Sequence, residues 1–135
     1  MVEITAEQLA EALEILRFLE KKHKKYYFHE KVAILIATTG TNNLDYKNEW
    51  ADKIYHIQGS VVQNDTTGYT WLGWGVLSGE VLHIFDEVIT PLKDAWYKTS
   101  DEQVITEGET YQARLTGCTA GDVLTMFVWG WWEEV

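Results

Sequence analysis

The sequence predicts a mainly β protein, an antiparallel β-sandwich preceded by one amphipathic α-helix. Apolar residues recur at helical spacing near the start of the chain, whereas after about residue 31 short apolar stretches alternate with turn-forming residues. With 135 residues and one proline, the chain suits one folded domain with its own core. We divide it into a helical segment, residues 1–30, expected to pack on or beside the sandwich, and the sandwich itself, residues 31–135.

The helix is predicted over residues 6–26. Thr5 and Gln8 have the spacing of a capping box, in which their side chains satisfy free backbone groups at a helix start. Apolar residues then recur at helical spacing: Leu9, Leu13, Leu16, and Leu19 or Phe18, with Ile15 beside them. Glutamates gather at the start and a basic run closes the segment, which complements the helix dipole.

The β-strands are predicted from short apolar runs between turn formers. Residues 32–37 suit a fully buried strand, and the polar residues 41–50 that follow indicate a loop anchored by Trp50. Further strands are expected over residues 53–63, 69–77, 80–89, 93–99, 102–106, 110–116 and 123–132. Because no helical pattern separates these strands, an antiparallel sandwich or barrel is favoured.

Two sandwich topologies fit strands of this number and length, a jelly roll and an immunoglobulin-like fold. The immunoglobulin-like fold is typified by a cysteine pair across the sheets with a tryptophan packed against it. Cys118 is the one cysteine in the sequence, so this chain cannot form such a pair. The jelly roll is therefore favoured.

The closing segment resembles a known family. The stretch GETYQARLTGCTAGDVLTMFVWGWWEE, Gly108 to Glu134, is similar to the last two strands of single jelly-roll structural proteins of phages and archaeal viruses. The shared elements are a Gly-Glu strand entry, a glycine-rich link ending in Ala-Gly-Asp, and a long apolar strand ending in glycine beside aromatic residues. The resemblance implies an assembly role, as a capsid or other virion subunit in the virion or the host cytoplasm. It transfers no catalytic residue to this chain.

Aromatic residues on the closing strand raise the question of what covers them. Because side chains alternate along a strand, the two faces of this strand are both apolar. One face should carry Leu124, Met126, Val128 and Trp132, and the other Val123, Phe127, Trp129 and Trp131. A strand that is apolar on both faces needs cover on both, which the helix, a neighbouring subunit or a stacked sugar could supply. The tryptophans expected to make such contacts are Trp71, Trp74, Trp129, Trp131 and Trp132.

The sequence contains no pattern that indicates catalysis, and we expect a non-enzymatic protein without a cofactor. It lacks a nucleophile elbow, and its glycines at 73, 75 and 79 do not have dinucleotide-loop spacing. A metal site of two histidines and one carboxylate is conceivable at His56, His83 and Glu87. Isolated histidines in strands are more often hydrogen-bonded surface or core residues, so no metal is expected.

The net charge of −10 is unevenly distributed. Residues 1–31 contain six basic and six acidic residues, whereas residues 32–135 contain five basic and fifteen acidic ones. Such a surface repels phosphate backbones and anionic lipid, so we expect neither nucleic acid nor membrane as a partner of the main body. A weak, salt-sensitive anion contact is conceivable at the basic run Lys21, Lys22, Lys24 and Lys25. We also expect no signal peptide and no transmembrane segment, because no apolar run approaches about 20 residues.

These observations predict a structural or assembly subunit that forms homo-oligomers, or joins other structural subunits, through aromatic-rich strand surfaces. The alternative is a module that binds a carbohydrate or another small ligand on exposed tryptophans.

Overall fold

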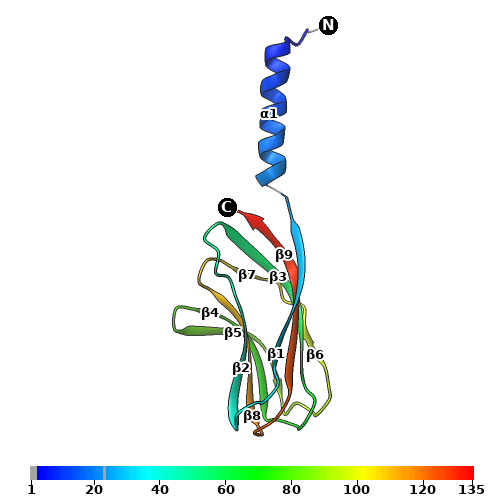
Figure 1. Ribbon diagram of the computed structural model, residues 1–135, viewed down its shortest axis with the longest axis vertical. Helices are drawn as coiled ribbons and strands as arrows, with labels where there is room; N and C mark the ends of the chain where they lie inside the picture. Colours follow the sequence, from blue (N-terminus) through cyan, green and yellow to red (C-terminus); the bar gives the residue numbers. More distant parts are fainter. Residues whose placement is uncertain (1–2, 23) are drawn as a thin grey trace.

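The protein is a two-layered β-sandwich with one helix that extends from its end (Figure 1). The structure, a computed structural model, describes residues 3–22 and 24–135, without the side chains of residues 19–22. Helix α1 spans Ala6–Lys22. The strands follow as β1 (Tyr26–Ile34), β2 (Gly40–Lys47), β3 (Lys53–Asn64), β4 (Trp71–Ser78), β5 (Val81–Ile89), β6 (Tyr97–Thr99), β7 (Gln103–Ile105), β8 (Thr110–Cys118) and β9 (Leu124–Glu134).

The strand order is that of a jelly roll. Strands β6 and β7 both pair with β3 and act as one interrupted strand. The first strand then pairs with the last and the pattern continues inward: β1 with β9, β2 with β8, β3 with β6 and β7, and β4 with β5. This is one long antiparallel hairpin rolled into two sheets, β1-β9-β3-β6 with β7 (sheet A) and β2-β8-β4-β5 (sheet B). The predicted antiparallel, jelly-roll-like sandwich with an N-terminal helix is confirmed.

Helix α1 begins at the predicted capping box. The backbone N–H of Thr5 donates to Gln8 Oε1 at 3.0 Å, and the backbone N–H of Gln8 donates to Thr5 Oγ1 at 3.1 Å. The helix ends at Lys22, four residues earlier than predicted, because the chain enters β1 at Tyr26. Pairing with β9 along the whole of β1 outweighs the helical tendency of these residues.

The apolar face of α1 lies away from the sandwich. Figure 1 shows the helix pointing outward from one end of the sheets, along the longest axis of the molecule. Its large apolar side chains are 45–66% exposed: Leu9, Leu13 and Leu16 on this face, and Ile15 and Phe18 farther round the helix. The sequence predicts that this helix packs on or beside the sandwich, whereas in the structure its apolar side chains are exposed. The two sheets cover each other's inner faces, and side chains of sheet A cover much of its own outer face, as described below.

Strand β2 occupies the segment that the sequence indicates as a loop. Its pattern of burial alternates, with Asn42 and Leu44 buried and Tyr46 half buried. Asn42 tolerates burial because its Nδ2 donates to the Thr38 carbonyl oxygen at 2.8 Å and its Oδ1 accepts from the Thr38 backbone N–H at 3.1 Å. Because β2 has polar residues on both faces, its sequence lacks the alternation of apolar and polar residues from which a strand is predicted.

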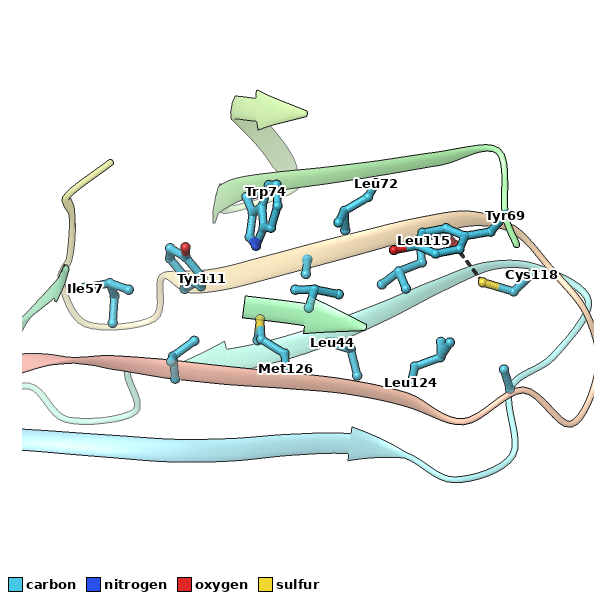
Figure 2. Close-up of a cluster of buried hydrophobic side chains, with 14 of the residues drawn as sticks. Leu44, Ile57, Tyr69, Leu72, Trp74, Tyr111, Leu115, Cys118, Leu124 and Met126 are labelled. Atoms are coloured by element: carbon cyan, nitrogen blue, oxygen red, sulfur yellow. Dashed lines mark hydrogen bonds between the residues drawn. The ribbon is translucent and has the colours of Figure 1, made fainter. Parts of the chain in front are cut away.

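The hydrophobic core fills the space between the two sheets (Figure 2). Its fully buried side chains come from both layers: Ile57, Leu124, Met126 and Val128 from sheet A, and Leu44, Leu72, Trp74, Tyr111 and Leu115 from sheet B. Trp74 is 1% exposed, and its Nε1 donates to Ser60 Oγ on the opposite sheet at 3.0 Å. The prediction that Trp74 contacts a partner is therefore wrong, because β4 directs this indole into the core, where its polar atom is already satisfied.

Asp122 joins three loops of the sandwich. Its Oδ2 accepts hydrogen bonds from Asn64 Nδ2 (2.8 Å), Thr67 Oγ1 (2.7 Å) and the Thr119 backbone N–H (2.8 Å), and its carbonyl oxygen accepts from the Ala37 backbone N–H (2.9 Å). Burial opposes ionisation of the carboxyl group, but these side-chain and backbone hydrogen bonds outweigh it and lower the pKa of Asp122. The buried carboxylate thus joins the end of β3 and the β3–β4 loop to the β8–β9 loop, and the Asp122 backbone adds the β1–β2 loop.

Candidate functional site

The outer face of sheet A carries the aromatic residues of β9. Burial alternates along this strand, with Leu124, Met126 and Val128 buried and Phe127, Trp129 and Trp131 half buried, as the sequence predicts. Residues directly opposite in an antiparallel pair share a face. The residues of β1 and β3 that share this outer face are Tyr27, His29, Lys31, His56, Gly59 and Val61.

Both ring faces of Trp131 are occupied by side chains of the same chain. His56 stacks on Trp131 with ring centroids 3.7 Å apart and an interplanar angle of 7°. Lys25 Nζ lies 4.5 Å from the Trp131 ring, which at this stacking distance requires the opposite ring face. His56 also lies 3.5 Å from carboxylate oxygens of Glu102 and Glu133. This layered group leaves no open indole face for a stacking ligand.

Trp132 is enclosed in a similar way on the inner face of sheet A. Tyr26 stacks on it with ring centroids 4.1 Å apart and an interplanar angle of 12°. Lys53 Nζ lies 4.3 Å from the Trp132 ring and 4.4 Å from the ring of Trp50. Two cation–π contacts therefore share one lysine, and Trp50 is the outermost and most exposed ring of the group, at 54%.

Trp129 and Phe127 form the remainder of the outer aromatic strip. Trp129 packs directly on the backbone of β3, since a Cβ atom at Gly59 would come within 2.6 Å of its ring. Lys98 Nζ lies 5.8 Å from the same ring. Phe127 contacts Trp96 with ring centroids 5.9 Å apart, and Trp96 is 48% exposed.

Trp71 lies on the outer face of sheet B, on the other side of the sandwich. Its ring covers Gly73, where any Cβ atom would overlap the indole. Its Nε1 donates to Glu87 Oε2 at 2.8 Å. The five tryptophans chosen from the sequence therefore form no common surface. They are divided between the core (Trp74), two outer faces (Trp71 on sheet B, Trp129 and Trp131 on sheet A), and the inner face of sheet A (Trp132).

The two histidines and the glutamate considered as metal ligands lie apart. His56 is on β3 in sheet A, whereas His83 and Glu87 are on β5 in sheet B. A β-bulge shifts the register of β5, so that His83 lies opposite Val76 and Glu87 opposite Gly73, on opposite faces of sheet B. Within residues 3–22 and 24–135, no group of three or more His, Cys, Asp or Glu residues is arranged to hold a metal ion.

Of the four lysines in the basic run, the structure describes the side chains of Lys24 and Lys25. The side chains of Lys21 and Lys22 lie outside the part that the structure describes. Lys24 Nζ lies 4.9 Å from the Tyr26 ring, and Lys25 covers Trp131. These two lysines therefore contact aromatic rings at the junction between helix and sandwich.

Buried groups with potential reactivity are held in their neutral forms. Burial raises the pKa of the Cys118 thiol, which keeps it protonated at neutral pH and makes it a poor nucleophile. Burial likewise raises the pKa of Tyr46, Tyr69 and Tyr111. We therefore assign these side chains to the packing of the core.

Exposed apolar groups that sequence reasoning did not select are the main candidates for contacts. They are the apolar face of α1 and the two most exposed tryptophans, Trp50 and Trp96. The available signal for Trp50 is its polar neighbourhood, Glu49-Trp50-Ala51-Asp52, which cannot form an alternating buried strand. The helical stripe is visible in the sequence, but a stripe does not reveal what covers it.

Comparisons with known proteins find structural likeness without a family assignment. No protein-family model and no curated protein matches the chain. Among solved structures, the chain is similar to murine APRIL (13% identity, TM-score 0.47, covering 78% of this chain and 98% of that one). It is also similar to a structure of disulfide-linked Bacillus endospore appendage pili (16%, 0.43, 81% and 91%) and to a β-1,3-glucan-binding CBM6 from Bacillus halodurans (15%, 0.32, 85% and 90%). Likenesses at these identities and TM-scores carry no conclusion about function. Among the described helical residues, none form a helix with the length and hydropathy needed to cross a bilayer.

Proposed function

We propose that the protein is a non-enzymatic structural subunit that self-associates, and that α1 is its main association surface. The observation that carries this proposal is the 45–66% exposure of five large apolar side chains on one 17-residue helix. Helices in proteins gain most of their stability from packing of their apolar face, and α1 has no such packing within the described chain. No segment within the described chain covers these side chains, which supports the proposal that another copy of the chain does so.

The aromatic surfaces of the strands have a secondary part in this proposal. Trp131 and Trp132 are poorly suited to contact a second copy, because side chains of the same chain already occupy their ring faces. His56 and Lys25 cover Trp131, and Tyr26 and Lys53 cover Trp132. The outermost strands of each sheet still have backbone groups without a neighbouring strand, and an assembly can cover such edges.

The finer proposal is that the assembly is a viral shell or another part of a virion, located in the virion or the host cytoplasm. Its support is the resemblance of residues 108–134 to phage and archaeal virus proteins, together with the jelly-roll strand order. Jelly rolls are common in capsids, but they also occur in lectins and other proteins, so the order alone is compatible with several functions.

Analytical ultracentrifugation of the full chain tests self-association through α1. The variant Leu9→Gln/Leu13→Gln/Leu16→Gln removes the apolar stripe while keeping helix-forming residues. Its matched control, Val81→Gln/Ile84→Gln/Ile89→Gln, changes three apolar residues of similar exposure on β5. We expect the wild type and the control to sediment as oligomers and the helix variant as a monomer. A monomeric wild type at every concentration contradicts the proposal.

Carbohydrate binding is the second candidate function. It is favoured by Trp71 and Trp129, which are half buried and packed on glycine backbones, so that each presents a broad ring at the surface. Trp131 and Trp132 are unsuited to this role because their ring faces are occupied. A titration with soluble glycans that quenches tryptophan fluorescence in the wild type, but not in Trp71→Ala or Trp129→Ala, would support this alternative.

A further inference from the structure

The charges of helix α1 are divided between its two halves. Residues 6–14 carry a net charge of −3 and residues 15–22 a net charge of +2. The acidic half contains Glu7, Glu11 and Glu14 without a basic residue, and the other half contains Arg17, Lys21 and Lys22 with Glu20. This separation of acidic and basic residues belongs to the helix. The rest of the chain carries a strong negative charge.

We infer that α1 pairs with α1 of a second copy of this chain in the antiparallel orientation. The inference rests on the proposed self-association and specifies its partner and geometry. Antiparallel pairing places the acidic half of each helix beside the basic half of the other. Parallel pairing places like charges together along the whole length. Packed helices lie about 8–10 Å apart, close to the screening length of physiological salt, so flanking charges still interact.

The positions of the side chains on the helix agree with this orientation. Leu9, Leu13 and Leu16 lie along one stripe, at the i, i+4, i+7 spacing of a helix seam, and all are at least 45% exposed. When the pair is centred near residue 13, Leu9 of one helix lies close to Leu16 of the other. Arg17 borders this stripe, whereas Glu7 and Glu14 lie farther round the helix on its polar side, so the opposite charges of the two halves act across the pair beside the leucine seam.

The shape of the subunit accommodates the pair without a clash between sandwiches. The sandwich lies beyond the C-terminal end of α1 (Figure 1), so an antiparallel pair has one sandwich at each end. A 17-residue helix is about 25 Å long, which allows the helices to overlap fully before either start reaches the partner's sandwich. The start of the partner helix, with Glu3, then comes close to the junction where Lys24 and Lys25 cover Tyr26 and Trp131.

Distances between spin labels distinguish the two orientations. Single cysteines are introduced as Glu7→Cys or Glu14→Cys in a Cys118→Ala background of the full chain. Both positions lie on the polar side, two turns apart, so Glu14 is the matched control for Glu7. In an antiparallel pair centred near residue 13, the axial separation of equivalent positions is about 18 Å at residue 7 and about 3 Å at residue 14, from the 1.5 Å rise per residue. In a parallel pair the two distances are equal.

The outcomes separate this inference from the proposed function. A dimer whose label distance at position 7 exceeds that at position 14 by about 15 Å supports antiparallel pairing. Equal distances, or a trimer in sedimentation, overturn the antiparallel pair while leaving self-association intact. A chain that sediments as a monomer at every concentration overturns both. So does a monomer that binds vesicles of phosphatidylcholine and phosphatidylserine through α1, because the helix face is then covered by lipid.

Discussion

Removing the carboxylate of Asp122 should release the hydrogen bonds that join the β3–β4 loop to the β8–β9 loop. In Asp122→Ala, three donors lose their acceptor, of which Asn64 is fully buried and Thr67 half buried. A buried polar group left unsatisfied costs about 1–3 kcal/mol, and the more exposed donors can be hydrated at lower cost. We therefore expect Asp122→Ala to lower the free energy of unfolding by about 2–4 kcal/mol, a large part of the roughly 5–15 kcal/mol typical of domains.

The variant Asp122→Asn isolates the effect of charge. It keeps the size and one acceptor, but it loses the negative charge and places an amide near the position of Oδ1, for which the described residues offer no hydrogen-bond partner. We expect a loss of about 1–3 kcal/mol, smaller than that of Asp122→Ala. Asp65→Asn, in the adjoining exposed loop, is the matched control and should change stability by less than about 0.5 kcal/mol.

The pH dependence of Asp122→Asn gives the sharper result. Because the pKa of Asp122 is lowered in the folded state, ionisation contributes stability that is present above the unfolded-state pKa, about 3.9. This contribution is lost as the pH falls through the folded-state pKa. Urea denaturation should therefore show a difference between wild type and Asp122→Asn that is largest near pH 7 and shrinks below about pH 4. A difference that stays constant between pH 7 and pH 3 would refute the role assigned to the carboxylate.

Three further variants test the packing around the closing strand. Gly130→Ala should cost at least about 3 kcal/mol in urea denaturation, because the added Cβ overlaps the His56 carbonyl oxygen. Gly68→Ala, where the added Cβ makes ordinary van der Waals contact 3.6 Å from the Pro91 carbonyl oxygen, should change stability by less than about 1 kcal/mol, and equal effects of the two changes would contradict the close approach at Gly130. Trp74→Phe should lower stability by about 2 kcal/mol without changing the sedimentation coefficient, and dissociation of the oligomer would show that this residue reaches an interface. Trp131→Ala should likewise destabilise the sandwich while leaving association through α1 intact, and a monomeric product would favour the aromatic strip as the interface.

The fold follows from the sequence where the periodicity is strong. The alternation of Leu124, Met126 and Val128 with Phe127 and Trp129 predicts both faces of β9 correctly, because the period of two is a property of the extended backbone. The capping box predicts the start of α1 because it depends only on contacts between residues three positions apart. Features set by local geometry are thus accessible from the chain alone.

Features set by long-range pairing are less accessible. Strand β2 is missed because Asn42 is buried through hydrogen bonds that no apolar pattern reveals. The register shift of β5 is missed because one extra residue reverses the faces of His83 and Glu87 relative to simple alternation. The candidate metal ligands are separated both by this bulge and by the pairing of the strands, which places His56 in sheet A and the other two residues in sheet B. The site residues are the hardest part, because amphipathicity shows that a face needs cover but leaves the covering molecule open.

Hydrogen exchange of the full chain over a range of protein concentrations tests the central claim most directly. If a second copy covers α1, the protection of amides in residues 6–18 should rise with concentration, while the protection of β3, β8 and β9 stays constant. Protection of the helix that is the same at every concentration, in a chain that remains monomeric, would contradict the claim that α1 is completed by another copy of this chain.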